Sequence, residues 1–343
     1  MRKLILAGLA AAGGAAWLAA SPHAGFSGSR TVEIGLGTPT RVIARTLEEQ
    51  GVVRSQYLFL LARAIRPSAV LKAGEYRFEK AASAIEVFDR LVRGDVHYHR
   101  LQVPEGSNIF DVARIAEESG LFRASEFLKA ASDSSLVRDL DPAAKNLEGY
   151  LFPSTYRVTK QTTADQLCRM MTEQFRAVWK QVAPTGSPRP HEAVTLASLV
   201  EKETGAAHER PLVASVFRNR LNRAMPLQCD PTTIYAAMLD GRWRGKIYRS
   251  DLDHAHPYNT YRHAGLPPGP IASPGKAAIE AALAPPPSNF LYFVAKPGAA
   301  REHNFSATLS EHERAVAEYR NGASTNQAKP APASTGRTQP GRS

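Results

Sequence analysis

Ten residues near the middle of the chain, Leu196 to Gly205, constrain its fold more than any other segment. The first half is almost wholly apolar and continues a helical pattern that starts near His191, while the glycine marks a stop. Two acids, Glu201 and Glu203, stand just before that stop. A carboxyl group on an otherwise apolar helix is costly unless it is paired or used in chemistry. The segment therefore predicts a buried helix that delivers a carboxyl group at its C-terminal end.

Burial would make such a carboxyl group suitable as a proton donor. Removal from water raises a carboxyl pKa, so the group can stay protonated near neutral pH and donate a proton, as cleavage of a glycosidic bond requires. On a helical wheel the clearly polar side holds Thr195, Ser198 and Lys202, and both glutamates point away from it. The apolar side lies somewhat closer to Glu203, but periodicity alone does not choose between the two acids. The purely structural alternative is a pair of acids satisfied by arginine or by backbone at the helix end.

Composition limits the partners of the chain. Its 343 residues are enough for about two domains, and 43% hydrophobic with 22% charged residues allows a sizeable core. The formal net charge of +11 suits nucleic acid, an anionic membrane or an acidic polymer, or reflects a basic surface with no specific partner. Lys and Arg are spread along the chain without an arginine-rich tract or basic–aromatic interleaving. We therefore expect no nucleic-acid partner.

The N-terminus predicts export. Arg2 and Lys3 precede an uncharged run from Leu4 to Ala20, and the next formal charge is Arg30. Basic residues before an apolar run keep an N-terminus cytoplasmic, so residues 1–24 are expected to form a membrane anchor with the rest of the chain outside the cytoplasm. A cleaved signal peptide is the alternative, but no clean cleavage site follows the run.

Hydrophobic periodicity predicts an α+β fold in which two small strand-and-helix units precede a helix-rich part. The C-terminal segment 321–343 is rich in Ala, Pro, Thr, Gly and Ser and is predicted to be a disordered tail. The expected strands are 31–36, 71–78, 97–103 and 289–294, and the expected helices are 38–50, 55–65, 82–92, 108–117, 124–131, 163–182, 191–221 and 309–319.

Three further segments could form the walls of a substrate groove. Leu147 to Tyr156 is aromatic, and tyrosine offers a flat apolar face with a polar tip that suits a sugar ring. In Leu227 to Tyr235, Asp230 before Pro231 is expected to cap a helix, although Gln228 and Asp230 could also bind a polar substrate. Residues 257–275 are dense in proline, which stiffens a loop at low entropic cost. Each segment also has a plain structural interpretation as core or as turn.

Other chemistries find little support. His254, His256, His263 and His303 fall in predicted loops without the close spacing of metal ligands, so no metal and no other cofactor is expected. No Gly-x-Ser-x-Gly element or phosphate-binding glycine loop occurs. The two cysteines, Cys168 and Cys229, could pair outside the cytoplasm or remain separate buried thiols.

Five motifs taken together resemble the endolytic murein transglycosylases of the YceG-like family. They occur in the family's order between Leu147 and His312, and the residues before them look like the family's LysM-like region. Cys229 stands where a small polar residue is usual, and Ser154 where an aspartate is usual. The motifs are LEGYLFPSTY, ASLVEKETG, LQCDPTTIYA, PYNTYRHAGLPPGPIASPG and LYFVAKPG with HNFSATLSEH.

The resemblance implies a single-pass inner-membrane protein with a LysM-like subdomain over 31–100 and an extracytoplasmic catalytic domain over 101–320. It implies cleavage of the β-1,4 bond after N-acetylmuramic acid within nascent glycan strands, which leaves 1,6-anhydro ends without water and terminates strand elongation. It places the essential acid at the first glutamate of the VEKET motif, here Glu201. Peptidoglycan strands, the inner membrane and cell-wall synthases are the expected partners.

The resulting hypothesis gives one residue two roles. Protonated Glu201 donates to the glycosidic oxygen, and its carboxylate then accepts the proton of the sugar's 6-hydroxyl, which attacks the anomeric carbon. A non-catalytic glycan-binding regulator of synthases and a hydrolytic muramidase are the competing functions. The expected groove residues are Glu148, Tyr150, Gln228, Asp230, Tyr258, Asn259 and Tyr261.

Overall fold

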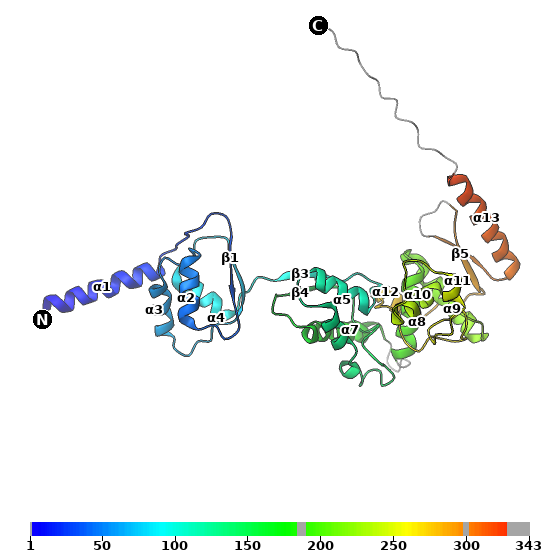
Figure 1. Cartoon of the computed structure of the whole chain (residues 1–343), viewed down its shortest axis with the longest axis horizontal. Helices are drawn as coiled ribbons and strands as arrows, with labels where there is room; N and C mark the ends of the chain where they lie inside the picture. The colour runs from blue at the N-terminus through cyan, green and yellow to red at the C-terminus, as the bar shows by residue number, and fades with distance from the viewer. Residues whose placement is uncertain (1, 184–189, 298–301, 328–343) are drawn as a thin grey trace, which may run out of the picture. The chain divides into compact units, whose positions relative to one another are not determined.

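The computed structural model describes residues 2–183, 190–297 and 302–327, in two compact units (Figure 1). Unit 1 comprises Met1–Gln102, Arg114–Ala124 and Thr155–Leu167. Unit 2 comprises Val103–Ala113, Ser125–Ser154 and Cys168–Ser343. The first boundary lies close to the predicted one at residue 100. Segments 114–124 and 155–167 belong with unit 1, whereas the prediction assigned all of 101–320 to one domain.

The part of the chain that the structure describes contains helices and three two-stranded antiparallel sheets, so the α+β prediction is confirmed. The strands are β1 (Arg30–Ile34), β2 (Gly74–Phe78), β3 (His99–Gln102), β4 (Thr155–Val158), β5 (Tyr292–Ala295) and β6 (His303–Ser306). The helices are α1 (Arg2–Ala20), α2 (Thr40–Glu49), α3 (Gln56–Ile65), α4 (Ala84–Arg93), α5 (Ile109–Glu118), α6 (Ala124–Ala131), α7 (Ala164–Val182), α8 (Pro190–Glu203), α9 (Arg210–Asn222), α10 (Asp230–Leu239), α11 (Arg249–Leu252), α12 (Lys276–Leu283) and α13 (Leu309–Gln327).

In unit 1, helices α2, α3 and α4 share a core with the β1–β2 pair. Val32 is opposite Tyr76 in this pair, and both side chains are buried. Phe59 of α3 meets Phe88 of α4 edge to face, with ring centroids 5.5 Å apart. The Ser83–Glu86 capping box starts α4, and Gly94 ends it in the left-handed conformation. Strands β3 and β4 form a second pair in the same unit.

Helix α1 covers the apolar run that was predicted to be a membrane anchor. It packs against α3 and α4 as it enters unit 1. None of the described helices combines the length and the apolar character needed to span a bilayer. The role of this segment as an uncleaved anchor stays a prediction, with a cleaved signal peptide as the alternative.

In unit 2, α8 is the central element. It packs against α9, α10 and α12, and every residue from Ala193 to Val200 is buried. The β5–β6 pair lies against α13 and α9. Helix α13 continues to Gln327, beyond the end at 319 that was predicted, so the predicted tail begins within a helix; residues 328–343 lie outside the described part. The first acid of α10, Asp230, is inside the helix, and the capping position belongs to Cys229.

Candidate active site

The two acids at the end of α8 project from nearly opposite sides of the helix. An α-helix turns about 100° per residue, so Glu201 and Glu203 are separated by roughly 200° around its axis. Each acid therefore meets a different part of unit 2. This separation decides which of them is available to a substrate.

Glu201 is held in a network of its own. Its Oε1 is 2.9 Å from Nη2 of Arg210, and its Oε2 accepts a hydrogen bond from the N–H of Gly275 at 2.9 Å. Only 5% of its side chain is exposed. These contacts hold the Glu201 side chain in a fixed position, and its role as the essential acid, which the resemblance implied, stays a prediction.

Two of the three polar residues on one side of α8, Thr195 and Ser198, are buried. Ser198, one turn before Glu201, accepts a hydrogen bond from the N–H of Ile271 at 3.1 Å, which fastens the proline-rich loop to the helix. Lys202 is exposed and donates to the carbonyl of Gly106, before α5, at 3.1 Å.

Glu203 lines a pocket of about 250 Å³ within unit 2, hereafter the Glu203 pocket. Three of its other residues, Gln228, Asp230 and Tyr261, are among the groove residues predicted from the sequence. The pocket combines acidic, basic, amide and aromatic side chains, a mixture suited to a polar ligand with flat faces. Its lining residues are Glu203, Phe217, Arg220, Leu227, Gln228, Asp230, Tyr261, Phe293 and His312.

The electrostatics of the pocket favour a protonated Glu203. Burial raises its pKa, and the negative charge of Asp230 raises it further. The thiol of Cys229 and the charges of His303 and Arg220 act in the opposite direction, but the net shift is upward. The position at the C-terminus of α8 also disfavours a carboxylate, because the last carbonyl groups carry partial negative charge. Glu203 thus has the property of a general acid.

Asp230 and Tyr261 form a fixed pair beside this acid. The Tyr261 hydroxyl donates to Oδ1 of Asp230 at 2.6 Å. Burial raises the pKa of Tyr261, and the bond to Asp230 raises it further, so the phenol stays protonated. Asp230 is exposed and free to accept a second hydrogen bond from a substrate hydroxyl.

Backbone and buried polar contacts hold the pocket walls in place. Arg220 donates from Nε to the carbonyl of Leu291 at 2.6 Å and from Nη1 to the carbonyl of Leu227 at 2.9 Å. Glu209 accepts hydrogen bonds from the backbone N–H of His303 at 2.8 Å and is 2.7 Å from its Nδ1. The strand pair that supplies Phe293 is thereby tied to the segment just after α8, and the geometry is preorganised.

Two predicted groove residues belong to the core instead. Glu148 is buried, and its carboxyl group accepts from the N–H groups of Ile109 at 3.0 Å and Gly149 at 3.3 Å. Burial raises its pKa to about 7, although these hydrogen bonds and the nearby Tyr235 hydroxyl lower it. Tyr150 is also fully buried, and its hydroxyl donates to Asp141. Both side chains are buried, and their role as groove residues stays a prediction.

Tyr258 and Asn259 contact other residues of unit 2 and do not line the Glu203 pocket. The Tyr258 ring is 5.1 Å from that of Tyr235, and burial raises its pKa to about 12. Asn259 is fully buried, and its amide donates to the carbonyls of Leu252 at 2.9 Å and His254 at 2.7 Å. Its Oδ1 accepts from the N–H of Tyr261 at 3.0 Å, so it acts on the pocket only by fixing that tyrosine.

Four pocket residues come from positions that sequence analysis did not single out. Phe217 and Arg220 are one turn apart on α9, a helix with no motif of its own. Phe293 and His312 lie in the LYFVAKPG and HNFSATLSEH motifs, but no role was predicted for either residue within those motifs.

The described residues contain no group of three or more His, Cys, Asp or Glu side chains placed to hold a metal ion. Cys168 and Cys229 are both buried free thiols. Burial raises the pKa of the Cys229 thiol well above its ordinary value, and the neighbouring Glu203 carboxyl raises it further. This thiol is therefore a neutral neighbour of the acid.

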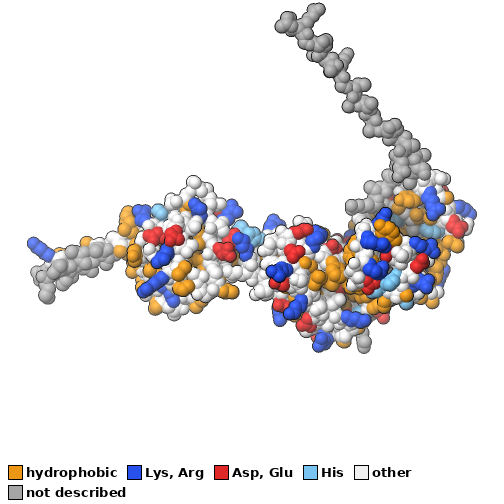
Figure 2. Space-filling view, in the orientation of Figure 1, with side chains coloured by type: hydrophobic (Ala, Val, Ile, Leu, Met, Phe, Trp, Pro, Cys, Tyr) orange, Lys and Arg blue, Asp and Glu red, His pale blue; other side chains and the backbone are white. Residues whose placement is uncertain are grey.

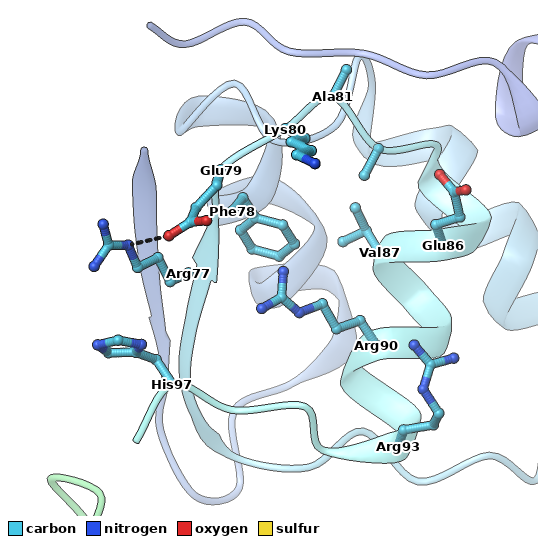
Figure 3. A pocket seen from close by; sticks show the side chains of 11 residues that line it. Arg77, Phe78, Glu79, Lys80, Ala81, Glu86, Val87, Arg90, Arg93 and His97 are labelled. Carbon is cyan, nitrogen blue, oxygen red and sulfur yellow. Dashed lines mark ion pairs between the residues drawn. The ribbon is translucent and has the colours of Figure 1, made fainter. Parts of the chain in front are cut away.

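Unit 1 has a larger pocket of about 520 Å³ between β2 and α4 (Figure 3). Arg90 extends over the ring of Phe78 there, 4.9 Å from its centroid. The two acids of this pocket are engaged: Glu79 pairs with Arg77 at 3.2 Å, and Glu86 accepts from the N–H of Ser83 at 2.7 Å. It therefore offers no proton donor comparable to Glu203.

Comparisons with known proteins match most of the chain. The model of the YceG-like family matches residues 32–318. A protein of Bacillus subtilis named endolytic murein transglycosylase is 31% identical over 307 residues, which cover 84% of each chain. A protein of the same name from Streptococcus pneumoniae is 31% identical over 85% of this chain and 58% of its own.

A solved structure extends the likeness to the fold. The crystal structure of a YceG-like protein from Listeria monocytogenes superposes with a TM-score of 0.56 at 31% sequence identity. The match covers 83% of this chain and 98% of that chain.

Proposed function

Because the chain belongs to the YceG-like family, we propose that it is a peptidoglycan lytic transglycosylase that uses Glu203 as its proton donor. One observation carries the proposal: Glu203 is the acid whose pKa is raised within a pocket that also presents Asp230 and Tyr261. The names of the relatives indicate murein as the substrate and cuts within the strand.

The reaction needs one acid in two protonation states. Protonated Glu203 donates to the oxygen of the β-1,4 bond between N-acetylmuramic acid and N-acetylglucosamine as that bond breaks through an oxocarbenium-like state. The resulting carboxylate then accepts the proton of the 6-hydroxyl of the muramic acid residue, whose oxygen bonds to the anomeric carbon. The products are a strand with a 1,6-anhydro end and a strand with a free 4-hydroxyl, and no water is consumed.

Pocket groups support these steps without taking part in bond cleavage. Asp230 can accept hydrogen bonds from sugar hydroxyls, and the amide of Gln228 can accept or donate them, while Tyr261 and Phe293 offer flat faces. The attacking hydroxyl belongs to the sugar itself, so its effective concentration is high and no second enzyme carboxylate is needed as nucleophile.

The cellular setting is part of the same proposal. A murein substrate places the reaction outside the cytoplasm, with α1 as the membrane attachment and unit 1 as the LysM-like region. Termination of strand growth and association with cell-wall synthases remain predictions from the resemblance.

Product analysis tests the assignment. The wild type, Glu203→Gln and Glu201→Gln are each incubated with uncrosslinked glycan strands, and products are identified by mass spectrometry. Anhydro ends from the wild type and Glu201→Gln, but not from Glu203→Gln, are expected. The reverse pattern for the two variants would return the acid to Glu201.

Two other outcomes would reject the reaction itself. Reducing ends in place of anhydro ends would show a hydrolytic muramidase. Intact strands with measurable binding by the wild type would show a glycan-binding protein that does not cut.

A further inference from the structure

Helix α3 of unit 1 presents apolar side chains to solvent as well as to the core. Phe59 and Ala62 on one side are buried, whereas Tyr57 and Ile65 on the other are 74% and 69% exposed. Leu61 lies between these two, one helical turn from each, and is 37% exposed. Ordinary surface helices expose polar residues on this side. The outer side of α3 is therefore an apolar stripe that no described residue covers.

The chain around α3 adds a further exposed apolar residue and basic residues. Val70, five residues beyond the helix, is 74% exposed, and we call Tyr57, Leu61, Ile65 and Val70 the α3 stripe. No acid occurs between Gly51 and Ala73, whereas Arg54, Arg63, Arg66 and Lys72 all fall there.

Most of this charge is not neutralised within the fold. Arg66 pairs with Asp89 of α4. Arg63 donates to the carbonyls of Arg66 and Ala69, and Lys72 donates to the carbonyl of Arg93, so both keep a net positive charge. Arg63 and Arg66 lie on the other side of α3 from Leu61, whereas the exposed Arg54 and Lys72 are three residues before Tyr57 and two residues after Val70. An apolar surface with basic residues at its ends is complementary to the head groups and outer acyl region of an anionic bilayer.

The position of α1 agrees with this partner. Helix α1, drawn in Figure 1, packs directly against α3. Its Trp17, one turn before the end of α1, is 70% exposed. Figure 2 shows hydrophobic side chains together with basic and acidic ones on the visible face of unit 1. Tyrosine and tryptophan favour the boundary between water and lipid.

We propose that the α3 stripe seats unit 1 on the surface of an anionic bilayer, with α3 in the plane of the head groups. This contact is additional to α1 and independent of the reaction in unit 2. A second copy of the chain is the less suitable occupant, because pairing two such faces would bring their uncompensated positive charges together.

The test measures the depth of α3 in lipid. The full chain is reconstituted in vesicles containing phosphatidylglycerol, with an environment-sensitive fluorophore on Leu61→Cys or Ile65→Cys; the natural thiols, Cys168 and Cys229, are buried. Glu79→Cys, at an exposed position outside the stripe in the same unit, is the matched control. Lipids that carry a quencher near the head group should quench the probes at 61 and 65 but not the probe at 79.

The charge part of the proposal has its own measurement. Quenching at Leu61→Cys should fall in vesicles of phosphatidylcholine alone and with added salt, because both weaken the attraction of the basic residues. Circular dichroism confirms that each labelled variant is folded. No quenching at 61 and 65 in vesicle-bound protein, or crosslinking between copies through these positions, would overturn the proposal.

Discussion

Arg210 Nη2 and Glu201 Oε1 are 2.9 Å apart, and this ion pair turns one of the two acids of the VEKET motif into part of the scaffold. Its neighbour Glu203 faces the pocket. The two similar residues of this motif thus have different surroundings, because the helical backbone of α8 directs them to nearly opposite sides.

Glu201→Gln should change stability and leave the chemistry intact. The variant keeps an oxygen for the N–H of Gly275 but leaves the mostly buried Arg210 without its closest counter-charge. We expect a loss of about 1–3 kcal/mol in the free energy of unfolding. Chemical denaturation measures it.

The matched control is Glu105→Gln, which removes the other acidic partner of Arg210, 3.4 Å away and half exposed. It should cost about 0–1 kcal/mol. Equal losses for the two variants would contradict a buried structural role for Glu201.

Activity should decline as the pH rises through the pKa of Glu203. The reaction begins with its protonated form, and because burial and Asp230 raise this pKa, the decline is expected above the range of an ordinary carboxyl group. Asp230→Asn removes a negative charge but keeps an acceptor for Tyr261, so the alkaline limb should move to lower pH. A pH profile of kcat/KM measures the shift, with Asp253→Asn as a surface control. An unmoved limb would contradict the assignment.

Glu148 should make stability fall between about pH 4.5 and 7. Its folded pKa is about 7, against an ordinary value of 4.5, so the folded state binds the extra proton in this interval. The contribution of Glu148 to the free energy of unfolding is fully present below pH 4.5 and is lost as the pH rises through about 7, by roughly 3 kcal/mol in total. Glu148→Gln should flatten this part of the curve of unfolding free energy against pH. A decline that persists unchanged in the variant would exclude Glu148 as its source.

Gly149→Ala should be strongly destabilising. Its φ is +83°, and an added Cβ would lie 2.5 Å from Cβ and Cγ of Pro270. Gly265 has a similar φ of +90° but open space around it, so Gly265→Ala reports backbone strain alone. We expect Gly149→Ala to cost about 2–3 kcal/mol more than the control, measured by thermal unfolding. Equal costs would show that the loop yields at Pro270.

Local patterns predicted unit 1 well, because its strands and helices are short amphipathic elements with clear boundaries. The stop after α8 was also visible in the sequence. The different surroundings of Glu201 and Glu203 were not, because they depend on Arg210, the first residue of α9, and on Gly275, just before α12, and the periodicity of α8 does not show which residues of other elements its side chains meet.

Some predicted groove residues line the Glu203 pocket and others do not, for the same reason. Tyrosine and asparagine in a proline-rich loop suit either a substrate or the loop itself, and only the fold distinguishes them. The side-chain amide of Asn259 donates hydrogen bonds to three backbone carbonyls, while Tyr261, two residues later, lines the pocket.

The last residue along the sequence that lines the Glu203 pocket is His312 of α13. More than a hundred residues separate this histidine from Glu203. During synthesis, the helix that bears Glu203 is therefore made well before α13, so the Glu203 pocket is not enclosed until α13 has been made.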